Sequence, residues 1–315
     1  MHAYFPTSET CPRNSQRHGW WFHRGPAGAQ TLSLGDEVWG GVNQVPARDP
    51  RPDLEWLTRI AYAVDRAVGT TLRSPRRGDP IGMGADGSPT ELLDQVAERE
   101  VLRELERWKL PWNLLSEEAG HIDRGGESLL VLDPVDGSHN AVHGIPFFTV
   151  SLALGTRSMS DVRAGVVHDL VRGVTYAAIR EGGAWANGRR LGTRTWTPGR
   201  DLFFVNLGAH STPRAHAVAS IPRRTRALGC ASLELCLVAE GVGDAYFCDN
   251  APPSKNLRVT DLAAAQLILR EAGGGVSEGT GREELDLPLE LTHRSSVFAW
   301  GDRSLRDHGL EGEAR

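Results

Sequence analysis

The stretch LLVLDPVDGSHNAVHGIPFF, residues 129–148, joins the pattern of a buried strand to a pair of acidic side chains. Its apolar run, residues 129–132, predicts a strand within the core. The run ends in two carboxylates, Asp133 and Asp136. Negative charges at the tip of a core strand are costly unless a cation neutralises them. The stretch therefore predicts a cation site at the end of this strand.

Carboxylates elsewhere in the chain extend this pair to a candidate ligand set. The set comprises Glu118, Asp133, Asp136 and Asp261, with Glu117 beside it. Oxygen-only ligation suits a hard ion such as Mg²⁺, which substrate phosphate usually completes. The glycine at 137 lets the backbone approach a ligand closely, and the N–H groups of Gly137 and Ser138 are placed to face an anion at the start of a short helix. A metal beside an anion pocket is the layout for metal-assisted phosphoester hydrolysis.

Each of these features also has a purely structural explanation. DPVDG is good turn chemistry, because Asp, Pro and Gly all favour tight turns. An acidic pair after a strand is a common solvated patch, and an aspartate at a helix start is an ordinary partner of the helix dipole. Taken singly, each feature is more often structural than catalytic, and only their joint occurrence in this order favours catalysis.

The composition is that of an ordinary globular protein. The 315 residues are 40% apolar and 24% charged, with a formal net charge of −5. This balance argues against binding to nucleic acid or a membrane surface, and the apolar runs are too short to span a bilayer. Four cysteines, Cys11, Cys230, Cys236 and Cys248, form no C-x-x-C pair. Without an apolar signal stretch at the N-terminus, we expect a cytoplasmic protein with reduced thiols.

The N-terminal third predicts an extension, a helix and a glycine loop. Residues 1–50 show no clear period and many turn formers, so we expect a poorly ordered extension. Residues 53–68 carry apolar side chains at helical spacing. GMGADG, residues 82–87, satisfies G-x-G-x-x-G, but no strand precedes it and no helix opens within it. A loop is therefore a better interpretation than a dinucleotide site.

The next predicted helix, residues 89–108, carries a carboxylate on its apolar face. Ser88 is a natural N-cap, Pro89 suits the first helical position, and Glu91 completes a capping box. The core-facing stripe consists of Ala97, Val101, Leu105 and Trp108. Asp94 lies on the same stripe, so it either has a buried partner or meets water at the edge of the core.

Strands, hairpins and helices alternate through the rest of the chain. Strands are expected at 147–155, 201–208 and 244–249, and hairpins at 164–179 and 182–191, the second turning at Asn187 and Gly188. Helices are expected at 232–241 and 260–275, the second with Thr260 as its N-cap and Asp261 as its first residue. Hairpins make antiparallel pairs, so we expect a layered α/β (α+β) fold with mixed, largely antiparallel sheets.

These motifs together resemble the inositol monophosphatase superfamily of Mg²⁺-dependent, lithium-sensitive phosphatases. The resemblance runs from about residue 53 to residue 302 and rests on Asp94, the Glu117–Glu118 pair, DPVDGS and TDLAAA…REAGG. It implies an inositol monophosphatase-like catalytic domain over residues 51–305, a tail over 306–315 and a homodimer. DGSPTELLDQVAE and DGSHNAVHGIPFFTVSLAL are most similar to the branch of bifunctional fructose-1,6-bisphosphatases/inositol-1-monophosphatases.

The resemblance also implies roles for individual residues. Glu118, Asp133 and the Val135 carbonyl would hold one Mg²⁺, and Asp133, Asp136 and Asp261 a second, with a third, weaker ion near Glu118; Mn²⁺ is a plausible substitute. Asp94 would be hydrogen-bonded to Ser138, and this pair, assisted by Glu118, would orient the attacking water. Asp136, with the N–H groups of Gly137 and Ser138, would lie at the substrate phosphate.

The expected activity is hydrolysis of fructose 1,6-bisphosphate, inositol 1-phosphate or both, by attack of a metal-activated water. Cys248 stands where inositol-specific members carry a glutamate, which weakens a strict inositol assignment. Alternatives are a 3′(2′),5′-bisphosphate nucleotidase of the same superfamily and a non-catalytic phosphosugar- or metal-binding regulator. Candidates for binding a second phosphate are Arg223, Arg224, Arg226, Lys255 and Arg258, whereas His139 and His143 are expected to have loop or packing roles.

Overall fold

The computed structural model describes residues 50–85, 87, 89–252, 256–279, 283–308 and 310. The chain divides into Met1–Asn43 and Gln44–Arg315, and every described residue belongs to the second unit. The expected extension before residue 50, Ser88 and Lys255 all lie outside the described residues. Within the described part, no helix has the length and apolar character needed to cross a membrane.

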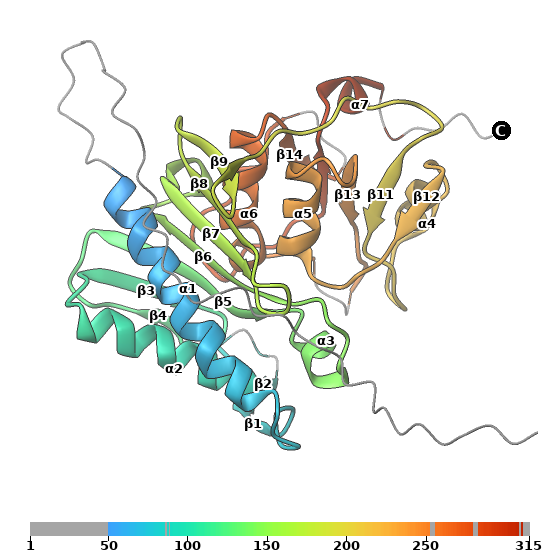
Figure 1. The fold of residues 1–315 in the computed structure, drawn as a ribbon. Helices are drawn as coiled ribbons and strands as arrows, with labels where there is room; N and C mark the ends of the chain where they lie inside the picture. The colour runs from blue at the N-terminus through green and yellow to red at the C-terminus, as the bar shows by residue number, and fades with distance from the viewer. Residues whose placement is uncertain are drawn as a thin grey trace, which may run out of the picture. The chain divides into compact units, whose positions relative to one another are not determined.

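The larger of two central sheets has eight strands in the order β10-β9-β8-β7-β6-β5-β3-β4 (Figure 1). Its strands are β3 (Trp112–Ser116), β4 (Gly120–Ile122), β5 (Ser128–Asp136), β6 (Thr149–Gly155), β7 (Ala164–Asp169), β8 (Thr175–Ile179), β9 (Gly183–Ala186) and β10 (Arg189–Arg190). Neighbours are antiparallel except β3 and β5, which are parallel. Both predicted hairpins are confirmed, and the second turns at Asn187 and Gly188, whose positive φ angles suit a tight hairpin turn.

Two long helices cover one face of this sheet. They are α1 (Arg51–Thr71) and α2 (Leu92–Arg107), which lie side by side in Figure 1. The apolar stripe of α1, including Leu57 and Ile60, packs with Ala97 and Val101 of α2 against strand residues in a single buried cluster. Helical periodicity therefore identified both helices and most of the faces that they bury. Trp108, predicted on the buried stripe, is instead the C-cap of α2 and is 40% exposed.

Two shorter helices, α5 (Ala231–Ala239) and α6 (Val259–Glu271), lie between the two sheets. Every residue of α5 is buried, as expected for a helix with a sheet on either side. The second sheet has the order β12-β11-β13-β15-β14. Its strands are β11 (Leu202–Val205), β12 (Arg224–Arg226), β13 (Ala245–Cys248), β14 (Gly275–Glu278) and β15 (Val297–Trp300).

The outer face of the second sheet carries α4 (Pro213–Ala219) and α7 (Arg303–His308). Leu305 of α7 is buried against this face. The domain was predicted to end at residue 305, but α7 continues to His308. The layers run helix, sheet, helix, sheet, helix, which confirms the layered fold with mixed, largely antiparallel sheets. The remaining short elements are β1 (Pro80–Met83), β2 (Pro89–Glu91), α3 (Ser138–His143) and a 3₁₀ turn at Met159–Asp161.

Two helices begin at other residues than those predicted. Residues 89–91 pair with β1 as strand β2, so α2 starts at Leu92, with Glu91 rather than Ser88 as its N-cap. Gly82 and Met83 of GMGADG lie in β1 and pair with β2, so the motif does not lead from a strand directly into a helix. Helix α6 starts at Val259 with Arg258, not Thr260, as its N-cap. In both helices the acidic residue singled out from the sequence is the third helical residue.

Candidate active site

The candidate site lies where two parallel strands end side by side. In the register of β3 and β5, Ser116 is opposite Leu132, so the residues that follow, Glu117 and Asp133, are carried to the same edge of the sheet. Strand β5 does not stop before its acidic residues but continues through Asp136. A bulge interrupts its pairing with β6 between Asp133 and Asp136. Bulges re-aim side chains, and this one lies beside the buried Val135.

Three aspartates converge at this edge. One carboxylate oxygen from each of Asp133, Asp136 and Asp261 lies within 4.8 Å of the other two. Asp133 and Asp136 are 2% and 8% exposed. Burial, followed by the negative charges of Glu117, Asp136 and Asp261, raises the pKa of Asp133 well above its ordinary value. Burial and then the charge of Asp136 raise the pKa of Asp261 to about 7.

The first residues of α5 hold Asp136 in place. Both the backbone N–H and the hydroxyl of Ser232 donate to Asp136 Oδ2, each at 2.6 Å. The hydroxyl of Thr149 lies 2.8 Å from that of Ser232 and continues the network. These donors favour the ionised carboxylate, but burial is the larger effect and leaves the pKa of Asp136 raised. Nothing in the local sequence pairs Ser232 with Asp136, so sequence reasoning missed it.

The acidic pair after β3 divides between two environments. Glu117 is in hydrogen-bond contact with Asp133 and adds to the rise of its pKa. Glu118 instead accepts a hydrogen bond from the hydroxyl of Thr90, and its charge raises the pKa of Asp94. Glu118 was predicted to share an ion with Asp133, whereas in the structure the glutamate in contact with Asp133 is Glu117. The register of β3 against β5 accounts for this contact, because it ends with Ser116 opposite Leu132 and the next residues are Glu117 and Asp133.

A buried carboxylate of α2 braces the turn that carries this pair. Glu98 is 9% exposed. Its Oε2 accepts hydrogen bonds from the hydroxyl of Ser116 and from the backbone N–H of Ala119, the latter at 3.0 Å. The turn between β3 and β4 is thereby tied to α2. Glu98 was not among the residues singled out from the sequence, where it looks like one more charged residue of an amphipathic helix.

Arginines balance part of the acidic charge. Arg258 is 4% exposed, and its Nη1 lies 3.7 Å from Glu117 Oε2. Its backbone N–H donates to Asp261 Oδ2 at 2.7 Å. Arg258 and Arg294 both lower the pKa of Asp261 against the larger effect of burial. Arg258, one of the residues proposed to bind a second phosphate, therefore lies beside Asp133, Asp136 and Asp261, which are called here the acidic cluster.

Asp94 and Ser138 are not joined as expected. Asp94 is 5% exposed, and its Oδ2 accepts a hydrogen bond from the backbone N–H of Glu91 at 3.2 Å, as the third residue of α2. Between Asp94 and Ser138, both of them described, no hydrogen bond is present. Burial, then the charges of Glu118 and Glu91, raise the pKa of Asp94 to about 8. The hydrogen-bond partner of the buried Asp94 carboxylate is therefore the backbone N–H of Glu91, the N-cap residue of α2.

A tight backbone at Gly137 leads from β5 into α3. Gly137 has φ +85°, and a Cβ there would lie 3.0 Å from the Phe147 carbonyl oxygen and 3.2 Å from Cys230 Cβ. Only glycine fits both the left-handed conformation and the close packing. The turn places Ser138 at the first position of α3, immediately beyond Asp136.

The remaining sequence candidates lie around this cluster in different settings. His139 and His143 stack on each other on α3, with ring centroids 4.1 Å apart. Cys248 is buried at the end of β13 and accepts a hydrogen bond from the Asn250 amide at 3.5 Å. The other arginines proposed for a second phosphate, Arg223, Arg224 and Arg226, line a separate pocket.

The acidic cluster fits a hard metal ion on its own chemistry. Asp133 Oδ1 is buried and has no hydrogen-bond partner among the described residues. Asp133 therefore presents an uncompensated oxygen to the point that Asp136 and Asp261 also face. A hard divalent cation satisfies such oxygens and removes the repulsion that raises these pKa values.

Comparison with known proteins agrees with this geometry. The model of the inositol monophosphatase family matches residues 53–307. A fructose-1,6-bisphosphatase/inositol-1-monophosphatase from Methanothermobacter thermautotrophicus is 36% identical over 265 residues, which cover 79% of this chain and 92% of that protein. A solved inositol monophosphatase-fructose 1,6 bisphosphatase shares 27% identity at a TM-score of 0.71, covering 81% of this chain and 97% of its own. The chain therefore belongs to the inositol monophosphatase family.

Proposed function

We propose that this protein is a metal-dependent phosphate monoester hydrolase that acts on phosphorylated sugars or inositols. The observation that carries the proposal is the convergence of Asp133, Asp136 and Asp261 within 4.8 Å at a buried edge of the sheet. The family relation and the bifunctional relative from Methanothermobacter support fructose 1,6-bisphosphate and inositol 1-phosphate as substrates. By the same relation the proposal includes two to three Mg²⁺ ions, with Mn²⁺ as a substitute, inhibition by lithium, a homodimer and a cytoplasmic location.

In this proposal Asp133, Asp136 and Asp261 hold the metal, and Glu117 takes the place first assigned to Glu118. The Val135 carbonyl, within the bulged end of β5, remains a candidate ligand. Mg²⁺ bound there would lower the pKa of a water molecule and neutralise the phosphoryl oxygens of a substrate. Ser232 fixes the orientation of Asp136 through its two hydrogen bonds.

The protein's own proton acceptor would come from the side of α2. Asp94 and Glu118 influence each other electrostatically, and the pKa of Asp94 is raised to about 8. A carboxylate with a pKa near the working pH can take a proton from an attacking water and release it again. Ser138, at the first position of α3, and the backbone N–H groups of Gly137 and Ser138 remain the candidates for contact with the phosphate.

Phosphate release from a small substrate panel tests this function. The panel holds fructose 1,6-bisphosphate, inositol 1-phosphate and adenosine 3′,5′-bisphosphate, each with Mg²⁺, with Mg²⁺ plus lithium, and with a chelator. We expect chelator-sensitive release, with one of the first two preferred. Preference for the nucleotide would favour the nucleotidase alternative. Tight binding of Mg²⁺ and a panel compound without turnover would contradict the enzymatic proposal.

The Asp133→Asn variant links the activity to the cluster. Removing a shared metal ligand should lower kcat by at least about 100-fold. Asp123→Asn, at an exposed aspartate of the same region, is the control and should leave kcat near that of the wild type. Near-normal turnover in Asp133→Asn would place the chemistry elsewhere.

A further inference from the structure

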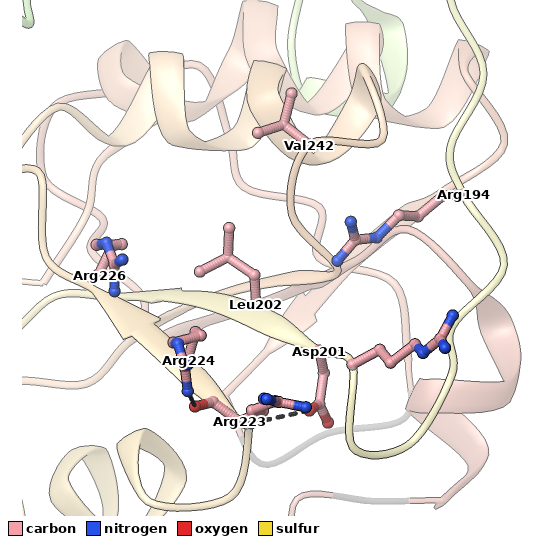
Figure 2. A pocket seen from close by; sticks show the side chains of 8 residues that line it. Arg194, Asp201, Leu202, Arg223, Arg224, Arg226 and Val242 are labelled. Atoms are coloured by element: carbon pink, nitrogen blue, oxygen red, sulfur yellow. Dashed lines mark hydrogen bonds between the residues drawn. The ribbon is translucent and has the colours of Figure 1, made fainter.

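A second charged site lies at the edge of the smaller sheet. Five arginines, Arg194, Arg200, Arg223, Arg224 and Arg226, line a pocket of about 360 Å³, called here the arginine pocket. Figure 2 shows Arg224 and Arg226 on β12, Arg223 next to the start of this strand, and Arg194 approaching from another segment. Side chains from separate parts of the chain therefore converge on one hollow.

Most of this positive charge is not neutralised within the described part of the chain. Arg194 forms a two-point ion pair with Asp244, with Nε to Oδ1 at 2.8 Å. For Arg200, Arg223, Arg224 and Arg226, the described residues offer no carboxylate within ion-pair distance, and all four are exposed. Asp201, the acidic residue of the lining, accepts a hydrogen bond from the backbone N–H of Arg223 at 2.8 Å. After Asp244 and Asp201 are counted, three positive charges remain in excess.

Protection of a sheet edge is the ordinary explanation for charge on β12. This strand is an edge of its sheet, and charged side chains discourage pairing with another chain. That explanation accounts for Arg224 and Arg226, which alternate along the strand. It does not account for Arg194 and Arg200, which belong to the segment before β11 and line the same hollow. Convergence from two segments is a feature of a binding site rather than of an edge.

The lining also contains apolar surface. Leu202 and Val242 form part of the wall, and Val242 is 44% exposed. A guanidinium group binds phosphate oxygens in a fork geometry, so several of them suit adjacent phosphate groups. The volume matches a small molecule, and the protein's net charge of −5 argues against a nucleic-acid surface.

The arginine pocket is separate from the acidic cluster. Its wall includes Val242, beyond the C-terminal end of α5, whereas Ser232, which holds Asp136, is the second residue of that helix. A helix of this length spans roughly 13 Å. Among the described residues, no hydrogen bond or ion pair joins the pocket's arginines to Asp133, Asp136 or Asp261. The phosphate groups of a ligand there would bind to arginines and would need no divalent metal.

We propose that the arginine pocket is a second ligand site, which binds a small organic polyphosphate: adjacent phosphate groups on the arginines and an apolar portion against Leu202 and Val242. The site does not depend on the proposed phosphatase activity. Its ligand differs from a substrate at the acidic cluster because it binds without metal.

Calorimetric titration of the full chain in a chelator tests this site. The probes are tripolyphosphate, ATP and orthophosphate, each at low and high salt. We expect tripolyphosphate to bind more tightly than orthophosphate, and ATP to bind at least as tightly as tripolyphosphate. The affinities for tripolyphosphate and for ATP should both fall as the salt concentration rises. The variant Arg200→Gln/Arg223→Gln/Arg224→Gln should bind at least about tenfold more weakly.

A charge-matched variant provides the control. Arg66→Gln/Arg73→Gln/Arg303→Gln removes three exposed arginines from other surfaces and should bind like the wild type. Thermal unfolding should be unchanged in both variants, because the substituted side chains are exposed. The proposal is overturned by absence of binding to the wild type, by equal loss in both variants, or by much weaker binding of ATP than of tripolyphosphate. A change in molecular mass confined to the pocket variant, without loss of binding, would instead identify a contact between copies.

Discussion

At the scale of single residues, the division of labour between Glu117 and Glu118 is the most direct test of the site. Glu117 contacts Asp133, whereas Glu118 accepts a hydrogen bond from Thr90. We predict that Glu117→Gln weakens Mg²⁺ binding by about tenfold or more. Glu118→Gln should bind Mg²⁺ more nearly like the wild type and lower kcat instead. Calorimetric Mg²⁺ titration and steady-state kinetics of both variants measure the difference.

The exposed Glu127→Gln variant is the control for charge removal in the same region. If Glu118→Gln lost Mg²⁺ affinity while Glu117→Gln kept it, the assignment taken from the register of β3 would be wrong.

Arg258 is predicted to act as a built-in counter-charge. It is buried, lies 3.7 Å from Glu117 and caps the helix that carries Asp261. In Arg258→Gln the acidic cluster loses this compensation, so the metal-free protein should be destabilised by about 2–4 kcal/mol. Saturating Mg²⁺ should recover part of the loss, because metal replaces the missing positive charge. Denaturant unfolding in chelator and in Mg²⁺ measures both effects, with the exposed Arg303→Gln as control.

At the scale of elements, the site depends on how α5 meets the bulged end of β5. The serine at 232 donates twice to Asp136 Oδ2, so the start of the helix orients a ligand that a strand carries. We predict that Ser232→Ala raises the pKa of Asp136 further and weakens Mg²⁺ binding by about tenfold. The matched control is Ser277→Ala, which removes another buried hydroxyl, in β14. Equal Mg²⁺ affinity in the two variants would assign Ser232 a packing role only.

At the scale of the whole molecule, the buried carboxylates of the site make folding stability depend on pH. The folded-state pKa values of Asp94, about 8, and Asp261, about 7, lie well above the ordinary value near 4. At pH values between the ordinary pKa and the raised pKa, the folded state binds more protons than the unfolded state, so the free energy of unfolding falls as pH rises. We predict that the metal-free protein unfolds at a lower temperature at pH 8 than at pH 5.5.

Mg²⁺ should reverse this trend. Because the ion binds the deprotonated carboxylates, it should raise Tm more at the higher pH. Thermal unfolding in chelator and in Mg²⁺ at the two pH values checks both signs. If the metal-free protein were equally stable at both pH values, the raised pKa values of these carboxylates would not contribute to the free energy of unfolding.

Much of the fold could be predicted from the sequence because its signals are local. Helical spacing in residues 53–68 identified α1, and Asn187 and Gly188 identified a hairpin turn from their conformational preferences alone. Helix boundaries were less accessible. The N-cap of α2 moved from Ser88 to Glu91 because residues 89–91 pair with β1, and local capping preference cannot anticipate a strand partner.

By itself, the sequence determined many of the longer elements, the layered fold and the acidic composition of the site, since residue type and periodicity are properties of the chain. The tertiary structure decided which glutamate meets Asp133, which serine holds Asp136, which partner Asp94 takes and which arginines share a pocket. Those pairings join residues on separate elements. They follow from strand register and helix packing, which arise only when distant segments come together.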